Sequence, residues 1–588
     1  MSETAPIDPA PRSRLKRILS AMWGTRLDKS ASRIRLAAVG FVIVYAAIGG
    51  RLIQLGLKPE ASRGLKATAA EMVSGARPDI VDRNGEILAT DVKTQSVFAE
   101  PNRIIDKDEA VELLTAVIPD LDAKELRDKL GTRRGFVWVK RGVTPQQREE
   151  VHRLGLPGVG FLTENRRVYP NGPIAAHILG FTNVDNNGIA GIEKYIDGQG
   201  LAALHGAGFN VAAADFKPVQ LSIDLKATHA LRDELVQAQA KFRAKASAGA
   251  ILDVNTGEVI ALVSLPDYDP NQPADALDPN HINRLAVGVY EMGSTFKAIT
   301  TAMALESGKV NVNTRIDARG ALRYGRFTIK DYHAENRALS VTEVFQYSSN
   351  VGTARMALMV GVSGHKEFLR RMGQLDRMRT ELPESAEPIV PKNWGELNTM
   401  TIAFGHGLAV APLQALMAVG ALVNGGFMIK PTFLKRDEAS AREGAPRVVR
   451  PDVSEAMRYV LRNNAERGTA TRANIPGYYV GGKTGTAEKV INGRYAKNRL
   501  FTTFMAILPS DKPKYLFLTI FDEPQGLPET HGYATAGWNG APVTGRIIER
   551  VTPILGLAPR LDLPATPFPL LARYGVGSTD KTGSIVKR

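Results

Sequence analysis

The sequence predicts an α+β protein, in which an antiparallel sheet packed with helices follows a single transmembrane helix and an elongated non-catalytic domain. Apolar runs at 250–252 and 259–263 enclose Asn255 and Gly257, which is the pattern of two strands joined by a turn. One long apolar stretch and a region without a catalytic cluster precede this hairpin. Later strand-like runs lie at 478–483, 502–507 and 515–521, and an apolar helical pattern follows over 543–555.

Length and composition limit the class of protein. A chain of 588 residues is too long for one ordinary core, and 44% apolar with 23% charged residues is a globular composition. The absence of cysteine excludes a thiol nucleophile, a cysteine-ligated metal and a disulfide. The formal charge of +15 suggests nucleic acid, but basic residues crowd the first 35 positions, which indicates membrane topology instead and no nucleic-acid partner.

The N-terminal residues predict a membrane anchor. The stretch 36–57 is apolar apart from Arg51 and Gln54, and its length reaches the roughly 20 residues that span a bilayer. A cleaved signal peptide is the alternative, but the apolar stretch is long and lacks a convincing small-x-small cleavage site. Because the basic segment 1–35 precedes the span, we expect it to be cytoplasmic and the rest of the chain to lie across the membrane.

The remaining chain divides into three regions. Residues 58–218 combine strand-like runs at 96–99 and 135–139 with a helical pattern over 106–130, and they carry no catalytic cluster. A strand at 219–223 and an amphipathic helix at 225–245 open a second domain, which we expect over 219–557. Residues 558–588 are rich in Pro, Gly and Ser and are predicted to be disordered.

Ser294 and Lys297 are the candidate nucleophile and base. Attack on an amide needs a nucleophile beside a base, and residues i and i+3 share a helix face, so the Lys297 ammonium can reach the Ser294 hydroxyl. Lys297 acts as a base only if burial or a neighbouring cation lowers its pKa. Gly293 permits a tight entry into the helix. The same spacing recurs at Ser13/Lys16, Ser363/Lys366, Ser578/Lys581 and Ser584/Lys587, in polar or turn contexts.

Two further motifs complete a catalytic set. Ser348-Ser349-Asn350 supplies a hydroxyl that can pass a proton to a leaving amine and an amide that can hold a substrate peptide. Lys483-Thr484-Gly485-Thr486 follows an apolar run, so Lys483 can polarise Ser348 while Gly485 keeps a strand edge bare for substrate. A second Lys-Thr-Gly triplet at 581–583 lacks a flanking strand. No metal-ligand cluster occurs, and this chemistry requires no metal or cofactor.

With these motifs the chain resembles the penicillin-binding proteins over roughly residues 36–558. The first region adds to the resemblance, because four segments look like the pedestal, or dimerisation-type, domain of the class B members, and we expect them to serve structure rather than chemistry. Class A is disfavoured, since 58–218 is short for a glycosyltransferase domain. The four segments are Arg77–Ala89, Arg167–Pro170, Ala176–Gly180 and Gly188–Tyr195.

Within class B, Ser348-Ser349-Asn350-Val351-Gly352 is similar to the cell-division peptidoglycan D,D-transpeptidases (FtsI type), whereas elongation enzymes usually carry Ser-Cys-Asp. An elongation-specific transpeptidase and a D,D-carboxypeptidase or β-lactamase-like hydrolase remain as alternatives. A β-lactam sensor that keeps the acyl-enzyme as a signal is a more distant one, because sensors usually need further transmembrane helices.

The resemblance implies a mechanism. Lys297 would deprotonate Ser294, which attacks the penultimate D-Ala of a stem peptide, with the oxyanion held by the backbone N–H groups of Ser294 and Thr486. Thr484 and Thr486 would bind the terminal carboxylate, and Asn350 the peptide. Ser348 and Lys483 would carry the proton to the leaving nitrogen.

It also implies partners and a location. β-Lactams would acylate Ser294. A membrane glycosyltransferase of the FtsW type and other divisome proteins would be partners, with the enzyme in the bacterial inner membrane, its catalytic domain periplasmic, at the division septum.

Overall fold

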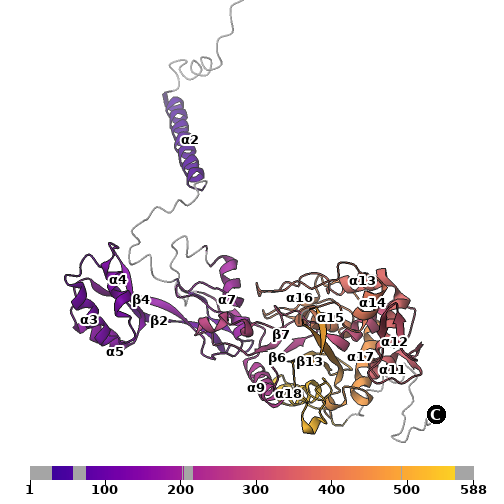
Figure 1. The fold of residues 1–588 in the computed structure, drawn as a ribbon. Coiled ribbons are helices and arrows are strands. Elements are labelled where there is room, and N and C mark those ends of the chain that lie inside the picture. Colours follow the sequence, from indigo (N-terminus) through magenta and orange to yellow (C-terminus); the bar gives the residue numbers. More distant parts are fainter. Residues whose placement is uncertain (1–28, 57–74, 202, 204–215, 492, 563–588) are drawn as a thin grey trace, which may run out of the picture. The chain divides into compact units, whose positions relative to one another are not determined.

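The computed structural model describes residues 29–56, 75–201, 203, 216–491 and 493–562 (Figure 1). The chain divides into two compact units, one up to Met72 and one from Val73 onward, and each is described here by itself. The predicted basic segment 1–35 and the tail 558–588 lie largely outside the described residues, so their roles stay predictions.

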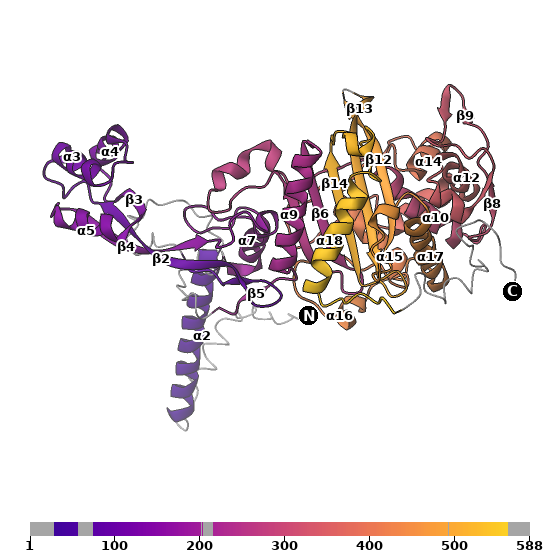
Figure 2. The same cartoon turned by 90° about the horizontal axis from the view of Figure 1, so that it is seen from below.

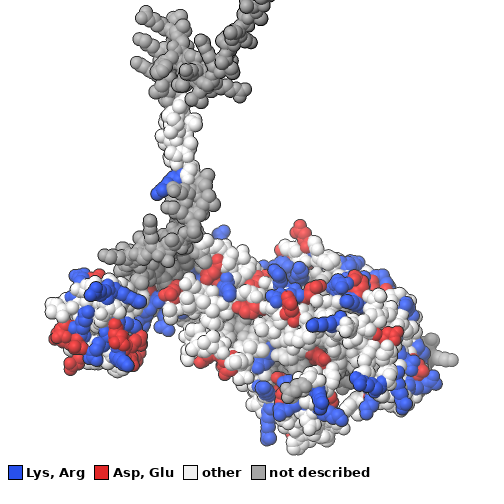
Figure 3. Space-filling view, turned by 45° about the horizontal axis from the view of Figure 1, so that its top comes forward, with Lys and Arg blue, Asp and Glu red and all other residues white. Residues whose placement is uncertain are grey.

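The described part of the first unit is the helix α2 (Lys29–Gly56). It covers the predicted apolar stretch 36–57 except for Leu57, which lies outside the described residues. Its described apolar side chains are exposed, as for Phe41 at 66% and Val42 at 67%, and this part of α2 is almost entirely white in Figure 3. Among the described residues, no helix meets the length and hydropathy needed to cross a membrane. The transmembrane helix therefore stays a prediction.

In the second unit, the N-terminal part is built on a sheet of five strands. The long strand β2 (Ile87–Ala99) pairs with β1 (Ile80–Val81) at its start, with β4 (Val159–Val168) from Thr90 onward, and with β3 (Val137–Val143) at its end. The short strand β5 (Val219–Gln220) pairs in parallel with β1, so only the start of the predicted strand at 219–223 is strand.

Three helices cover one face of this sheet. They are α3 (Lys107–Val117), α4 (Ala123–Gly131) and α5 (Pro145–Arg153), and a core that includes Val97 and Leu114 lies beneath them. The helical pattern predicted over 106–130 is thus two helices. Asp106 caps the first and Asp122 the second, and the segment between them contains Pro119, which favours a helix end.

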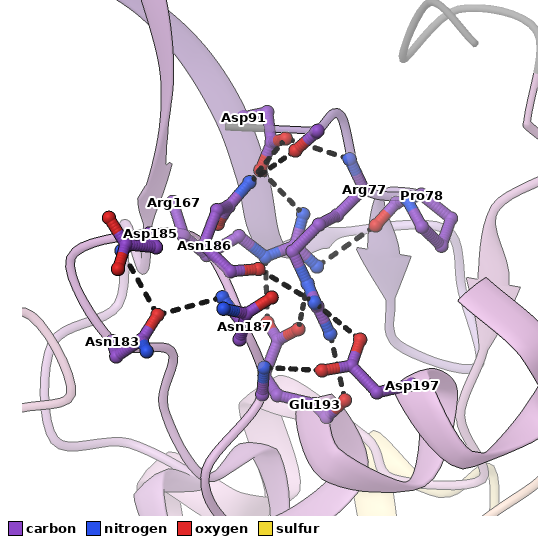
Figure 4. Close-up of polar contacts among 12 residues, drawn as sticks. Arg77, Pro78, Asp91, Arg167, Asn183, Asp185, Asn186, Asn187, Glu193 and Asp197 are labelled. Carbon is purple, nitrogen blue, oxygen red and sulfur yellow. Dashed lines mark hydrogen bonds and ion pairs between the residues drawn. The ribbon is translucent and has the colours of Figure 1, made fainter. Parts of the chain in front are cut away.

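The base of this N-terminal part is held together by a buried ionic cluster (Figure 4). Arg77 and Arg167 both bind Glu193, at 2.8 and 2.7 Å, and all three side chains are essentially buried. Arg77 also pairs with Asp197, and Arg167 with Asp91. Three of the four segments that resemble the pedestal domain thus contribute side chains to this cluster. Glu193 lies on the short helix α7 (Gly191–Ile196), which contacts α6 (Ala176–Leu179).

The C-terminal part is built on a five-stranded antiparallel sheet in the order β12-β13-β14-β6-β7 (Figure 2). Every residue of β14 is buried, because helices cover both faces of the sheet. Helices α9 (Leu225–Lys241) and α18 (Gly540–Ile554) pack on one face, and a larger group that includes α10 (Lys297–Glu306) packs on the other. The strands are β6 (Ala246–Asp253), β7 (Val259–Leu265), β12 (Gly481–Ile491), β13 (Arg494–Leu508) and β14 (Tyr515–Asp522).

The predicted hairpin, the strands at 502–507 and 515–521 and the last helix are confirmed, whereas the strand predicted at 478–483 begins only at Gly481. The helix predicted over 225–245 ends at Lys241, because Phe242 caps it and Arg243 takes a positive φ of 47°. The remaining helices and strands complete the α+β architecture: α11 (Val341–Gln346), α12 (Asn350–Val360), α13 (Val362–Arg371), α14 (Glu396–Ala403), α15 (Pro412–Val423), α16 (Glu438–Arg442), α17 (Pro451–Arg467), β8 (Arg315–Asp317), β9 (Leu322–Tyr324), β10 (Phe327–Ile329) and β11 (Ala338–Ser340).

Candidate active site

Ser294 lies in a short 3₁₀ helix (Gly293–Phe296) that runs directly into α10. Gly293 has a φ of 54°, and a Cβ placed on it would lie 3.0–3.1 Å from the backbone of Thr486 on β12. A Cβ on Gly405 would lie only 2.0 Å from the Gly293 carbonyl oxygen. The backbone before Ser294 is thus packed between β12 and the Gly405 turn, with Ser294 itself half-buried.

Ser348-Ser349-Asn350 forms the turn between α11 and α12. Ser348 has a φ of 56°, a conformation that a non-glycine residue adopts only where its surroundings hold it. Ser349 is the N-cap of α12, and its hydroxyl accepts a hydrogen bond from the Gly352 N–H at 2.9 Å. The cap fixes the turn so that Ser348 and Asn350 face α10.

Lys297 joins the first two motifs. Its Nζ donates to the backbone oxygen of Ser348, to Ser348 Oγ at 3.1 Å and to Asn350 Oδ1 at 2.8 Å. Among the described residues no hydrogen bond links Lys297 to Ser294, so the lysine is held here by the second motif rather than by the predicted nucleophile.

Lys483 brings the third motif to the same point. It lies on β12, the edge strand of the sheet, and its Nζ donates to Ser348 Oγ at 2.9 Å and to the Thr484 carbonyl oxygen at 3.1 Å. The ammonium also lies over the ring of Phe345. The three motifs predicted from sequence to act together therefore meet at Ser348 Oγ.

Burial sets the protonation of both lysines, since each side chain is only 1% exposed. Burial lowers the pKa of Lys297 to about 7, although the carboxylate of Asp331 opposes the shift. Burial, and then the nearby Lys297 charge, holds the pKa of Lys483 well below its usual range. Near neutral pH this site therefore contains a lysine that can accept a proton, which is what a base beside Ser294 needs.

Asp331 supports the site, and sequence reasoning missed it. Its carboxylate accepts hydrogen bonds from Ser349 Oγ at 2.7 Å and from the Val351 N–H at 2.9 Å. Asn350 Nδ2 donates to the carbonyl oxygen of the preceding residue, Lys330. The segment after β10 thus braces the turn that carries Ser348. Nothing in the local sequence around Asp331 marks it, because its partners are distant in the chain.

The three residues after Lys483 have distinct roles. Thr484 Oγ1 donates to Thr469 Oγ1 at 2.8 Å, and Thr486 Oγ1 accepts from the Ala536 N–H at 3.2 Å. A Cβ on Gly485 would lie 2.3 Å from Thr503 Oγ1 and 2.7 Å from the Met292 carbonyl oxygen. The absent side chain of Gly485 therefore lets β12 pack against the Ser294 segment. The bare edge predicted for substrate arises because β12 is the edge strand.

One competing motif copy lies among the described residues, on α13 and not in the segment that carries Ser294. Ser363 and Lys366 are exposed on α13, and Lys366 lies over the ring of Trp394. The copies at Ser13/Lys16, Ser578/Lys581 and Ser584/Lys587, and the second Lys-Thr-Gly triplet, lie outside the described residues. No group of His, Asp and Glu side chains suited to a metal ion occurs in the described part of the chain.

Two family models match the chain. The penicillin binding protein transpeptidase domain matches residues 248–549, and the penicillin-binding protein dimerisation domain matches residues 72–199. The first covers all of the candidate catalytic residues, and the second covers β1 to β4 and the buried ionic cluster.

The relatives agree with these matches. The chain is 39% identical over 505 residues to the "Probable peptidoglycan D,D-transpeptidase FtsI" of Caulobacter vibrioides, covering 84% of each chain. It is 31% identical to the "Probable peptidoglycan D,D-transpeptidase PenA" of Neisseria gonorrhoeae, over 91% of this chain and 95% of that one. It is 29% identical to the "Peptidoglycan D,D-transpeptidase FtsI" of Escherichia coli K12, over 84% and 86%.

A solved structure shares the fold. The crystal structure of penicillin-binding protein 3 from Mycobacterium tuberculosis, complexed with aztreonam, superposes with a TM-score of 0.63 at 23% identity. The match covers 84% of this chain and 100% of that chain.

Proposed function

The chain belongs to the penicillin-binding proteins, and from this premise we propose that it is a class B peptidoglycan D,D-transpeptidase that cross-links stem peptides of the septal cell wall. The reaction proceeds through a serine acyl-enzyme, and β-lactams are inhibitors because they acylate the same serine. The observation that carries the proposal is the convergence of Lys297 and Lys483 on Ser348 Oγ. Lys297 also binds Asn350 and lies one helical turn from Ser294.

Acylation needs a proton to leave the Ser294 hydroxyl and another to reach the departing amine. Lys297, with a pKa lowered by burial, accepts the first proton. Ser348 Oγ bridges Lys297 and Lys483, so it supplies a path from the base to the leaving nitrogen. The Ser294 and Thr486 backbones adjoin at Gly293, which supports their N–H groups as the oxyanion donors.

Recognition of the substrate falls to β12 and Asn350. Thr484 and Thr486 follow one another at alternate positions of an edge strand, so their hydroxyls share a face and can bind the terminal carboxylate of D-Ala-D-Ala. Asn350 Oδ1 accepts a hydrogen bond from Lys297, and Asn350 Nδ2 donates one to the Lys330 carbonyl oxygen. An ionised aspartate could not form the second bond, because its carboxylate has no donor. The structure thus gives a reason for asparagine at this position.

The decisive experiment labels the full-length protein with a fluorescent penicillin. Ser294→Ala should abolish labelling, whereas Ser363→Ala and Ser578→Ala, serines of the competing motif copies, should leave it intact. Labelling that persisted in Ser294→Ala would overturn the assignment. Incubation with peptidoglycan precursors should then yield cross-linked dimers. Rapid nitrocefin turnover without dimers would favour the hydrolase alternative.

We also propose that the enzyme is a single-pass inner-membrane protein, with the N-terminus cytoplasmic and the catalytic domain periplasmic, and that it works at the septum beside a membrane glycosyltransferase of the FtsW type and other divisome proteins. The basic N-terminus before the apolar stretch 36–57 supports the orientation. A fluorescent fusion should form midcell rings. A dispersed lateral pattern would favour the elongation alternative.

A further inference from the structure

The residues that lead to Ser294 contact β13, the strand next to the edge of the sheet. We call residues 290–294 the nucleophile segment. Tyr290 stacks on Phe501 with ring centroids 4.3 Å apart, and the Met292 carbonyl oxygen accepts from Thr503 Oγ1 at 3.3 Å. Contacts with β13 therefore set the position of this segment relative to the sheet before the chain reaches Ser294.

Glu291 is the acidic residue of the nucleophile segment, and the proposed mechanism does not use it. Its Oε1 accepts a hydrogen bond from the Gly407 N–H at 2.7 Å and another from the Tyr495 hydroxyl at 3.2 Å. Gly407 belongs to the turn that packs on Gly293, and Tyr495 lies on β13. One carboxylate oxygen therefore joins three segments that are far apart in the sequence.

One neighbour of the nucleophile segment is the loop after α14. Val410 and Tyr290 exchange two backbone hydrogen bonds, each of 3.0 Å, and the Gly293 N–H donates to the Gly405 carbonyl oxygen at 3.2 Å. The Glu291 side chain adds a third tie between these two contacts. The loop and the nucleophile segment are thus held together along their shared length.

The other neighbour is the outer part of the β12–β13 hairpin, beyond a shift in the register of the two strands. In this part Tyr495 lies opposite Val490, and Lys489 pairs with Asp522 at the end of β14 at 2.7 Å. Tyr495 is 49% exposed, so packing holds it only on one side. Among the described residues, its bond to Glu291 is the hydrogen bond that ties the outer hairpin to the nucleophile segment.

The surroundings of Glu291 exclude a direct role in the chemistry. Its Oε2 is shielded from solvent and has no hydrogen-bond partner within the described part of the chain, and its Oε1 already accepts two bonds. Burial raises the pKa of the Glu291 carboxyl, although the hydrogen bonds from Gly407 and Tyr495 oppose the shift. Neither oxygen is free to bind a substrate or to accept the Ser294 proton. What remains is a role in holding the segments together.

We infer that Glu291 is a positioning residue for acylation, which holds the nucleophile segment in register with β12 and its hairpin. The N–H groups of Ser294 and Thr486 come from the nucleophile segment and from β12, and a pair of donors stabilises an oxyanion only where both are aimed at it. A misplacement of about 1 Å can cost about a hundredfold in rate. The inference rests on the proposed function in taking Ser294 as the acylated serine.

The test measures acylation of the full-length protein, in detergent micelles, by increasing concentrations of a fluorescent penicillin. The concentration dependence separates the dissociation constant of the penicillin from the first-order rate constant of acylation. Glu291→Ala removes both hydrogen bonds and should lower the rate constant at least about tenfold, while the dissociation constant changes less than about twofold. Tyr495→Phe removes only the hairpin bond and should lower the rate constant about fivefold. Tyr324→Phe, at a similarly exposed tyrosine on β9, should acylate like the wild type.

Two further variants separate positioning from stability of the fold. Glu291→Gln keeps an oxygen that can accept from both donors, so it should recover most of the rate lost in Glu291→Ala. The double variant Glu291→Ala/Tyr495→Phe should be no slower than Glu291→Ala, because Tyr495 acts through Glu291. The urea midpoint of each variant is measured in parallel. A residue that only stabilised the fold would lower this midpoint and leave the rate constant unchanged below the unfolding transition.

An unchanged rate constant in Glu291→Ala or in Tyr495→Phe would overturn the inference. So would an effect confined to the dissociation constant, equal slowing in Glu291→Gln, or effects that multiply in the double variant. If Glu291→Ala does not fold, Tyr495→Phe decides the question, because it removes a single hydroxyl from a half-exposed ring. Labelling of Ser294→Ala tests the proposed function separately. If that labelling is abolished while Glu291→Ala acylates normally, the serine assignment stands and the positioning role falls.

Discussion

Lys297 and Lys483 share one acceptor: their ammonium nitrogens lie 3.1 and 2.9 Å from Ser348 Oγ. Both side chains are buried, and like charges in a poorly solvated site disfavour each other. Near neutral pH it is therefore costly for both lysines to be in the charged ammonium form at once. Ser348, held at a positive φ between the two lysines, is the group through which a proton can pass from one to the other.

The first prediction concerns the pH dependence of acylation. Lys297 accepts the Ser294 proton only in its neutral form, and burial lowers its pKa to about 7. The acylation rate with a fluorescent penicillin should therefore be low at pH 5.5, rise through about pH 7 and level off above it. His406 cannot produce this rise, because burial lowers its pKa to about 4. A rate that stays constant from pH 5.5 to 9 would contradict Lys297 as the base.

The second prediction concerns Asp331. Its carboxylate raises the pKa of Lys297 against the effect of burial, so Asp331→Asn should move the midpoint of the acylation profile to lower pH. The maximal rate should also fall, because the Ser349 hydroxyl and the Val351 N–H lose a charged acceptor. The control is Asp317→Asn, which changes an aspartate on β8 that pairs with Arg319 and should keep the wild-type midpoint. An unchanged midpoint in Asp331→Asn would show that the carboxylate does not act on Lys297.

The third prediction concerns the contact between β12 and the Ser294 segment. Gly485→Ala places a Cβ 2.3 Å from Thr503 Oγ1 and 2.7 Å from the Met292 carbonyl oxygen. Since the Met292 contact is with backbone, the strand and the 3₁₀ helix must separate, at a cost of about 1–3 kcal/mol. Penicillin acylation should slow by at least about tenfold, the factor that corresponds to 1.4 kcal/mol. Gly131→Ala, where a Cβ meets nothing within 4 Å, should acylate normally.

The parts of this structure that could be predicted from sequence depend on local patterns. The Asn255–Gly257 turn fixes a hairpin within one stretch of chain, and the three motifs carry side chains whose chemistry is recognisable without coordinates. The roles of Asp331 and of Gly485 in packing could not be predicted, because they depend on contacts between distant segments. The loop after β10 packs against the α12 cap, and β12 packs against Met292. The break between α3 and α4 was predictable, since Pro119 and Asp122 are local signals.

The last prediction tests the buried ionic cluster of the pedestal. Glu193 accepts from the Nε atoms of both Arg77 and Arg167, and the side chains are 0–1% exposed (Figure 4). Glu193→Gln keeps the shape but leaves two buried guanidinium groups short of one negative charge. Removing one partner of a buried ion pair costs about 3–5 kcal/mol, so the free energy of unfolding should fall by an amount of this order.

Chemical denaturation of the full-length protein, followed by far-UV circular dichroism, measures this change. Glu112→Gln, an exposed glutamate on α3, should keep the wild-type midpoint. Because the cluster lies in the pedestal and not beside Ser294, Glu193→Gln should still be labelled by penicillin at temperatures where it remains folded. A loss of stability below about 1 kcal/mol would mean that Asp91 and Asp197 are sufficient to neutralise both arginines.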